Sequence, residues 1–384
     1  MVWRIMCADV GPAHARMQLW EVMGPSDGAP NLAHDRWYQS CLFGDLESLA
    51  RRFLLDCSFP VPDGEEASVR CSGRYAGAVV HGACVAMCAR DAGARGPPGW
   101  APDARADLEV ALGAVVKRAV LLETFVAEAY GLALCPDADV APLPDQRAPA
   151  PGGARACVAC GAALEEALLL PDPSGDAPAY VAVRGDGGRT EFCARTDLEW
   201  ELRRWLVDRD GAAPVAAVVS GPGLANIYEF LAARRGDGAG EAILAVPLPE
   251  RPRAVADAAV NDDALALRAA TLFLEAFGAE LRQVALRGSP SGGLYLVAGG
   301  GVLDTLAPLL PLLADAYANG DARAAADLEN LPLLLAKNGD LAILGARCRA
   351  TRCLGDKRRK ALRTSIPHGA TRLIDKSSWA GFFG

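Results

Sequence analysis

The sequence predicts an α/β protein of two domains, because strand patterns alternate with helical ones over a sufficient length. The chain has 384 residues, enough for one or two sizeable hydrophobic cores. Apolar residues form 51% of it and charged residues 22%, a balance typical of globular proteins. Short apolar runs that end near glycines recur along the chain, and several of them precede a segment with helical spacing.

A net charge of −8 and a pI near 5.2 indicate an acidic protein. Nucleic acids and anionic membranes attract basic surfaces, so we expect neither as a partner and favour small metabolites or proteins. No apolar run reaches membrane-spanning length, and no segment resembles a signal peptide. We therefore expect no membrane span and a reducing intracellular compartment, the cytoplasm by default.

The twelve cysteines are scattered without regular spacing. Cys157 and Cys160 form a CxxC pair, but a zinc site needs a second pair at matching spacing, and the sequence has none. We interpret the two as small buried residues of a strand, and we expect no metal bound by the protein alone.

The N-terminal third predicts two paired strands and an amphipathic helix. A short apolar run over residues 2–9 and a second strand over 15–22 are joined by a tight turn at Gly11-Pro12. From Leu46 onwards, apolar residues recur at i, i+3, i+4, i+7 and i+8, which predicts a helix over 45–56. The other elements expected here are strands at 77–87 and 117–122 and helices at 104–112 and 126–134.

The remaining two thirds begin with an irregular connector. Five prolines between residues 135 and 155 exclude long regular elements there. Thr196 and Glu199 have the spacing of a capping box, and Asn261 or Asp262 is expected to cap a long helix running to about Arg287. The other elements expected here are strands at 156–160, 179–183 and 293–302 and helices at 303–318 and 341–350.

The stretch from Ser220 to Tyr228 is the motif around which the rest of the sequence is interpreted. It follows a valine-rich run over 215–219, which predicts a strand, a tight turn and a helix start. Gly221 and Gly223 permit positive φ, and the backbone N–H groups of a helix N-terminus point outward. Such a turn can face a ligand.

The C-terminus is basic and then aromatic. Residues 347–376 hold ten Lys or Arg against two Asp or Glu, and the last eight residues read Ser-Ser-Trp-Ala-Gly-Phe-Phe-Gly. We consider a docking segment and, as the alternative, a solvated terminus.

The order of three turns resembles that of bacterial-type glucokinases. These are an Asp-Val-Gly turn at Asp9, the Ser-Gly-Pro-Gly-Leu loop at Ser220, and an Ala-Gly-Gly turn at Gly299-Gly300. The resemblance covers about residues 1–350. It implies the two-domain actin/hexokinase-like (ribonuclease H-like) fold, with mixed sheets flanked by helices and with sugar and ATP in the cleft. The expected parts are a small α/β domain (1–117, rejoined by 340–354), a large α/β domain (118–339) and a basic, aromatic-ended tail (355–384).

The phosphate-binding turns depart from the family pattern. Where the family has Asp-x-Gly-Gly-Thr-x-x-Arg, Pro12 removes a backbone N–H and Ala13 removes a hydroxyl. The family's Gly-Thr-Gly-Leu-Gly loop resembles residues 161–165, and Glu165 places a carboxylate where triphosphate charge is expected. The residues that the resemblance assigns to ATP are Asp9, Gly11, Arg16, Gly161, Ser220, Gly221, Gly223, Gly299 and Gly300.

The sugar-binding positions depart as well. In the family, Asn-Asp-Phe follows a strand and the Asp takes the proton from the sugar hydroxyl; with Phe125 as anchor, Glu123 and Thr124 occupy the first two positions. Threonine cannot accept that proton near neutral pH. The family's remaining Glu, His and Glu sugar ligands correspond to Asp186, Arg189 and Ala216.

Three hypotheses follow for function. The first is a catalytically impaired glucokinase-like protein, which serves as a structural or interaction subunit bound to a protein partner or larger assembly through its surface or tail. The alternative is an active glucokinase that transfers the γ-phosphoryl group of ATP to glucose, with magnesium as cofactor and Asp186 or Glu123 as the base. The second alternative is a sugar- or nucleotide-sensing module.

Overall fold

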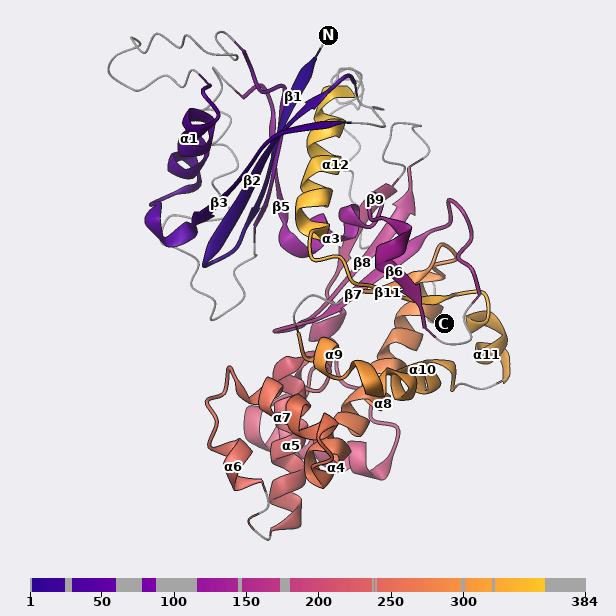
Figure 1. Cartoon of the computed structure of the whole chain (residues 1–384). Coiled ribbons are helices and arrows are strands. Elements are labelled where there is room, and N and C mark those ends of the chain that lie inside the picture. The colour runs from indigo at the N-terminus through magenta and orange to yellow at the C-terminus, as the bar shows by residue number, and fades with distance from the viewer. Residues whose placement is uncertain are drawn as a thin grey trace, which may run out of the picture.

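The computed structural model describes residues 2–24, 30–59, 78–87, 116–143, 147–172, 180–236, 238, 240–297, 301–319 and 322–355. Within these ranges the chain forms two mixed β-sheets with helices packed on their faces (Figure 1). The expected helix at 104–112 and most of the tail, residues 356–384, lie outside the described residues. No helix in the described part is both long and apolar enough to span a membrane.

The first sheet has the strand order β3-β2-β1-β4-β5. Its strands are β1 (Trp3–Val10), β2 (His14–Val22), β3 (Asn31–Gln39), β4 (Gly82–Met87) and β5 (Ala119–Glu123). β1, β2 and β3 are antiparallel neighbours, whereas β4 and β5 run parallel to β1. The four strands expected in this part are confirmed. The sequence did not indicate β3, because this edge strand carries polar residues on both faces.

Alternate side chains of β1 point to opposite faces of the first sheet and belong to two different hydrophobic cores. Met6 and Ala8 pack against α1 (Leu46–Asp56), whose predicted helix is confirmed and begins with a capping box of Asp45. Ile5 and Cys7 point to the other face, where α12 (Leu341–Gly355) covers the sheet. β5 belongs to this sheet although it follows residue 117, where the domain boundary is expected; the division into domains stays a prediction.

The second sheet has the strand order β6-β11-β10-β7-β8-β9, with parallel pairing of β7, β10 and β11 and antiparallel pairing elsewhere. Its strands are β6 (Val140–Pro142), β7 (Arg155–Cys160), β8 (Leu164–Pro171), β9 (Tyr180–Gly185), β10 (Leu294–Val297) and β11 (Leu333–Ala336). The strands expected at 156–160 and 179–183 and the start of the one at 293–302 are confirmed. Cys157 and Cys160 are buried in β7, as expected.

A helical layer covers one face of the second sheet and extends beyond it (Figure 1). Its long central helix is α8, and the apolar faces of its neighbours share one core with β7 and β10. The helices of this layer are α4 (Asp197–Asp210), α5 (Gly221–Arg235), α6 (Glu241–Leu244), α7 (Arg251–Val260), α8 (Ala264–Gly288), α9 (Val302–Thr305), α10 (Leu310–Ala318) and α11 (Ala322–Leu328).

Three local predictions in this layer are wrong. The valine run before Ser220 is a 3₁₀ helix (Val215–Ala217) rather than a strand, since a short buried apolar run has the same composition in either state. α8 is capped by Asp263, because Asp262 adopts a left-handed φ of 64°. The helix expected over 303–318 is divided into α9, a 3₁₀ turn and α10, with prolines at the two later starts. The capping box of Thr196 and Glu199 is confirmed.

α3 (Thr124–Gly131) contacts strands of both sheets and packs against α12. The two helices approach through glycines. A Cβ on Gly345 would lie 1.7 Å from the carbonyl oxygen of Ala127, and one on Gly131 would lie 2.0 Å from that of Leu341. No larger residue fits this crossing, which holds the region between the two sheets together (Figure 1).

Candidate functional site

The turn between β1 and β2 brings Asp9 and Arg16 side by side as cross-strand partners. Its backbone is already hydrogen-bonded within the protein: Gly11 N donates to His14 O (2.9 Å), and Ser40 Oγ donates to Gly11 O (2.8 Å). Burial raises the pKa of Asp9 to about 6; Arg16 lowers it and Asp340 raises it. The turn therefore offers a carboxylate that is ionised at neutral pH and readily protonated in mild acid.

Arg16 is held by two carboxylates from different parts of the chain. Its Nε and Nη2 donate to the carboxylate of Asp35 at 3.1 and 2.8 Å, and its Nη1 donates to Asp340 Oδ1 at 2.7 Å. The guanidinium also lies 5.3 Å from the ring centroid of Trp37. The arrangement ties the first sheet to the residue just before α12, and it leaves one N–H of each Nη of Arg16 outside these three bonds.

The turn between β7 and β8 lies near a group of carboxylates. The pKa of Glu128, on α3, is raised to about 8, mainly by burial and in addition by the nearby charges of Glu165 and Asp9. The charges of Asp9 on β1 and Glu165 on β8 thus disfavour the ionised form of Glu128 on α3. Asp9 and Glu165 were expected here from the sequence, but Glu128 was not. The sequence contained one signal for it: Glu128 lies one helical turn after Thr124.

The Ser220 corner joins this region from the helical layer. Ser220 Oγ accepts from Gly223 N (2.9 Å) and donates to Ala216 O (2.6 Å), so it caps α5. Gly221 N donates to Gly161 O at 2.8 Å, which fastens the N-terminus of α5 to the β7–β8 turn. A Cβ on Gly223 would lie 2.4 Å from Val218 O. The predicted motif therefore forms a corner in which serine and glycines are structurally required.

The late glycine turn is only partly visible. Gly299 and Gly300 lie outside the described residues, while Gly301 caps α9. A Cβ on Gly301 would lie 3.5 Å from Cys160 O, so this turn also reaches the end of β7. The described part of the ATP-assigned set is thus gathered at the ends of β1 and β7.

The sugar-assigned residues at the end of β5 include a second ion pair. Glu123 is the N-cap residue of α3, and its Oε2 lies 2.5 Å from Arg184 Nη1 on β9. Thr124 is the first residue of α3 and is half-buried. Arg184 was not expected at this site. It directly precedes the Gly185 to Arg189 loop, and it joins a strand of the first sheet to an edge strand of the second.

That loop continues as a 3₁₀ turn with exposed polar ends. Asp186 Oδ2 lies 3.7 Å from Arg189 Nη1, and their side chains are 65% and 84% exposed. Ala216 lies on the 3₁₀ helix before Ser220, where its carbonyl accepts from the serine. Asp186 is therefore the sugar-assigned carboxylate that is most accessible to a ligand.

The described residues contain no group of three His, Cys, Asp or Glu side chains that could hold a metal ion by themselves. Magnesium bound with a nucleotide uses one or two carboxylates and takes its other ligands from phosphates and water. Asp9 and Glu165 provide carboxylates of that kind, so the residues present fit a magnesium–nucleotide complex.

Solved structures share this architecture over nearly the whole chain. A glucokinase from an Antarctic psychrotroph superposes with a TM-score of 0.69 at 19% identity, covering 92% of this chain and 98% of that one. Leishmania braziliensis glucokinase gives a TM-score of 0.64 at 19% identity, covering 92% and 93%. Together with the two mixed sheets, these similarities define the actin/hexokinase-like fold of sugar kinases.

The family follows from the sequence match. The chain belongs to the glucokinase family, whose model, described as "Glucokinase", matches residues 6–353. Similar relatives are glucokinases of Nostoc punctiforme (26% identical, 91% of this chain and 99% of the relative) and of a Synechocystis strain (27% identical, 89% and 96%). It is thus a glucokinase-like sugar kinase by family and fold.

Proposed function

We propose that this protein transfers the γ-phosphoryl group of ATP to glucose. One observation carries the proposal: the described turns assigned to the nucleotide converge, with Gly221 bonded to Gly161 and with the charges of Asp9 and Glu165 both acting on Glu128. The match to relatives named glucokinase over 96–99% of their length supports it. A solved glucokinase from Balamuthia mandrillaris is described in complex with glucose, and we extend that ligand to this chain as part of the proposal.

Asp186 is our choice of proton acceptor. It is an accessible carboxylate, and the guanidinium of Arg189 at 3.7 Å is its partner. Glu123 is the less suitable candidate, because its Oε2 is already paired with Arg184 at 2.5 Å. Moving a proton from a sugar hydroxyl is worth about 10²- to 10⁴-fold in rate.

At the nucleotide end, Asp9 and Glu165 would hold the magnesium ion that accompanies ATP. The bound ion neutralises charge that develops on the transferring phosphoryl group. At the same turn the N–H groups of Gly221 and Gly223 are already bonded, to Gly161 O and Ser220 Oγ, and Pro222 has none, so the α5 N-terminus positions the turn. We place the protein in a reducing compartment, since the ten cysteines that the structure describes are all free thiols.

The test is formation of glucose 6-phosphate by purified protein at saturating glucose and Mg-ATP. We expect Asp186→Asn to lower kcat by about 10²- to 10⁴-fold, while Asp257→Asn, on an exposed helix surface, serves as the matched control. If Asp186→Asn keeps full activity, Asp186 is not the base, and Glu123→Gln then tests the other candidate.

A second function is favoured by a specific observation. Thr124 stands where the resemblance places the base, and the negative charges of Asp9 and Glu165, which both act on Glu128, oppose triphosphate binding. On this proposal the protein is a catalytically lapsed scaffold that acts by binding a protein partner. Neither turnover nor calorimetric binding of glucose would then be detected. Turnover in the unmodified protein contradicts the lapsed scaffold, and glucose binding without turnover indicates a sensing role instead.

A further inference from the structure

One face of the β8–β9 hairpin is apolar and uncovered. Leu168 pairs with Val183, and Leu170 pairs with Val181, so the four side chains share one face, here called the hairpin face. Of these side chains, Leu170 is 43% exposed, Val181 is 39% exposed and Val183 is 48% exposed. On the opposite face, the side chains of Ala167 and Leu169 are buried against α3. β9 is an edge strand, and the hairpin therefore extends past the helices that cover the rest of the sheet.

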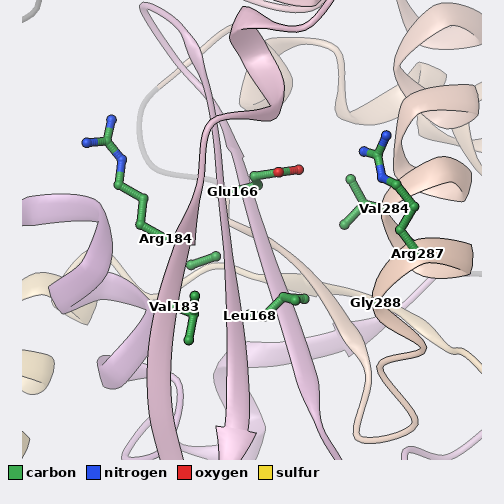
Figure 2. Close-up of a pocket in the computed structure, with 9 residues that line it drawn as sticks. Glu166, Leu168, Val183, Arg184, Val284, Arg287 and Gly288 are labelled. Atoms are coloured by element: carbon green, nitrogen blue, oxygen red, sulfur yellow. The ribbon is translucent and has the colours of Figure 1, made fainter. Parts of the chain in front are cut away.

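A cavity opens at the inner end of the hairpin face. Its volume is about 140 Å³, and it lies between β8, β9 and the last turns of α8. Figure 2 shows Leu168 and Val183 on the strand side, Val284 and Arg287 on the helix side, and Arg184 pointing away. An apolar cavity of about 150 Å³ accepts one benzene molecule. The cavity therefore has the size of a single phenyl ring.

The cavity is lined by one carboxylate, Glu166, and by two guanidinium groups, of which that of Arg184 pairs with Glu123. Glu166 points from β8 into the space in front of α8 (Figure 2). Its electrostatic neighbour among the described residues is Glu280, another carboxylate, whose pKa is raised by burial, lowered by Arg287 and raised further by Glu166. Arg287 is bonded to Glu280 at 3.1 Å rather than to Glu166. The cavity thus suits an apolar ring that arrives with a positive charge.

The chain itself carries such a group, and it emerges next to the hairpin. Near the end of α12, Arg352 donates to Tyr180 O at 2.9 Å and pairs with Asp172, at the two ends of the hairpin connection. The residues after 355 hold seven Lys or Arg against two Asp or Glu, in a chain of net charge −8, and end in Trp379, Phe382 and Phe383. The 27 residues from 355 to 382 span up to about 90 Å when extended, so they can pass around the edge strand.

We propose that the C-terminal segment 376–384 docks on the hairpin face of its own chain, with a phenylalanine ring in the cavity and the basic side chains of the tail near Glu166. The interaction combines ring burial with charge complementarity. Full burial of one phenylalanine shifts such a docking equilibrium by about 10- to 100-fold. This role of the tail does not depend on whether the protein phosphorylates sugar.

Hydroxyl-radical footprinting of the full-length protein, read by mass spectrometry, tests the proposal. In Phe382→Ala/Phe383→Ala, we expect oxidation of Val181 and Val183 to rise to the level of an uncovered strand. The matched control, Leu373→Ala/Ile374→Ala, removes two apolar side chains from the same tail and leaves the hairpin protected. Equal oxidation of the hairpin in the wild type and the Phe382→Ala/Phe383→Ala protein overturns the proposal.

The reciprocal experiment changes the hairpin face. Val183→Lys places a positive charge where the basic tail approaches, and we expect oxidation of Phe382 and Phe383 to increase. Val260→Lys is the control, since Val260 is an exposed valine on α7 away from the hairpin. Protection that grows with protein concentration identifies a second copy as the occupant and refutes docking within one chain.

Discussion

Replacing Glu128 with glutamine should make the protein more stable at alkaline pH. Glu128 lies on α3 between the sheets, where burial is the largest cause of its raised pKa and the charges of Glu165 and Asp9 add to it. Glutamine has nearly the same shape and carries no charge. Glu128→Gln therefore removes the desolvation and repulsion of the ionised carboxylate without leaving a cavity.

The size and sign of the effect follow from the pKa. An ordinary glutamate has a pKa of 4.5, and the folded protein raises that of Glu128 to about 8. The folded state thus binds more protons than the unfolded state between these values, so this group lowers the free energy of unfolding as pH rises from 4.5 to 8. One pKa unit is worth about 1.4 kcal/mol, which gives a loss on the order of 5 kcal/mol at pH 9. The variant escapes that loss.

Urea denaturation at pH 5, 7 and 9 measures the difference between the variant and the wild type. We expect the variant to gain little at pH 5 and most at pH 9, on the order of 5 kcal/mol. Glu241→Gln, at the exposed start of α6, is the control and should show no such trend. If the two stability curves stay parallel from pH 5 to 9, the placement of Glu128 among carboxylates is wrong.

Three further predictions concern the framework around the site. Gly345→Ala should lower the free energy of unfolding, measured by urea denaturation, by several kcal/mol, because the added Cβ would lie 1.7 Å from Ala127 O. If the variant is as stable as the wild type, α3 and α12 can move apart to accept the methyl group. Asp340→Asn should cost about 1 kcal/mol or less, since its side chain is 56% exposed and Arg16 keeps Asp35; a larger loss in thermal melts would contradict this. Thr196→Ala should lower the free energy of unfolding by about 1 kcal/mol, because it removes the N-cap of α4. An unchanged free energy of unfolding in urea denaturation would show that this cap does not stabilise the protein.

The local sequence pattern was sufficient to predict those helices and turns that depend on contacts between residues close together in the chain. The apolar spacing after Leu46 predicted α1, and the Thr196 capping box predicted the start of α4, because both depend on contacts within a few residues. Gly223 was expected in a tight turn with positive φ, but it lies in the first turn of α5 without one, and its close approach to Val218 O is the physical reason for a glycine there. The order of these turns also predicted the glucokinase family, which the match over residues 6–353 shows.

Tertiary structure decided the partners of each polar group. The sequence placed Glu128 one helical turn after Thr124 but could not show its raised pKa, since that depends on burial and on Asp9 and Glu165, which come from two strands. Arg184 was equally hidden, because its partner Glu123 lies on the other sheet. By itself, the sequence determined the family, most strands and helices, and the turns that carry the site. The charges that face one another there were set by the three-dimensional arrangement, because electrostatic interactions depend on distance in space and on burial.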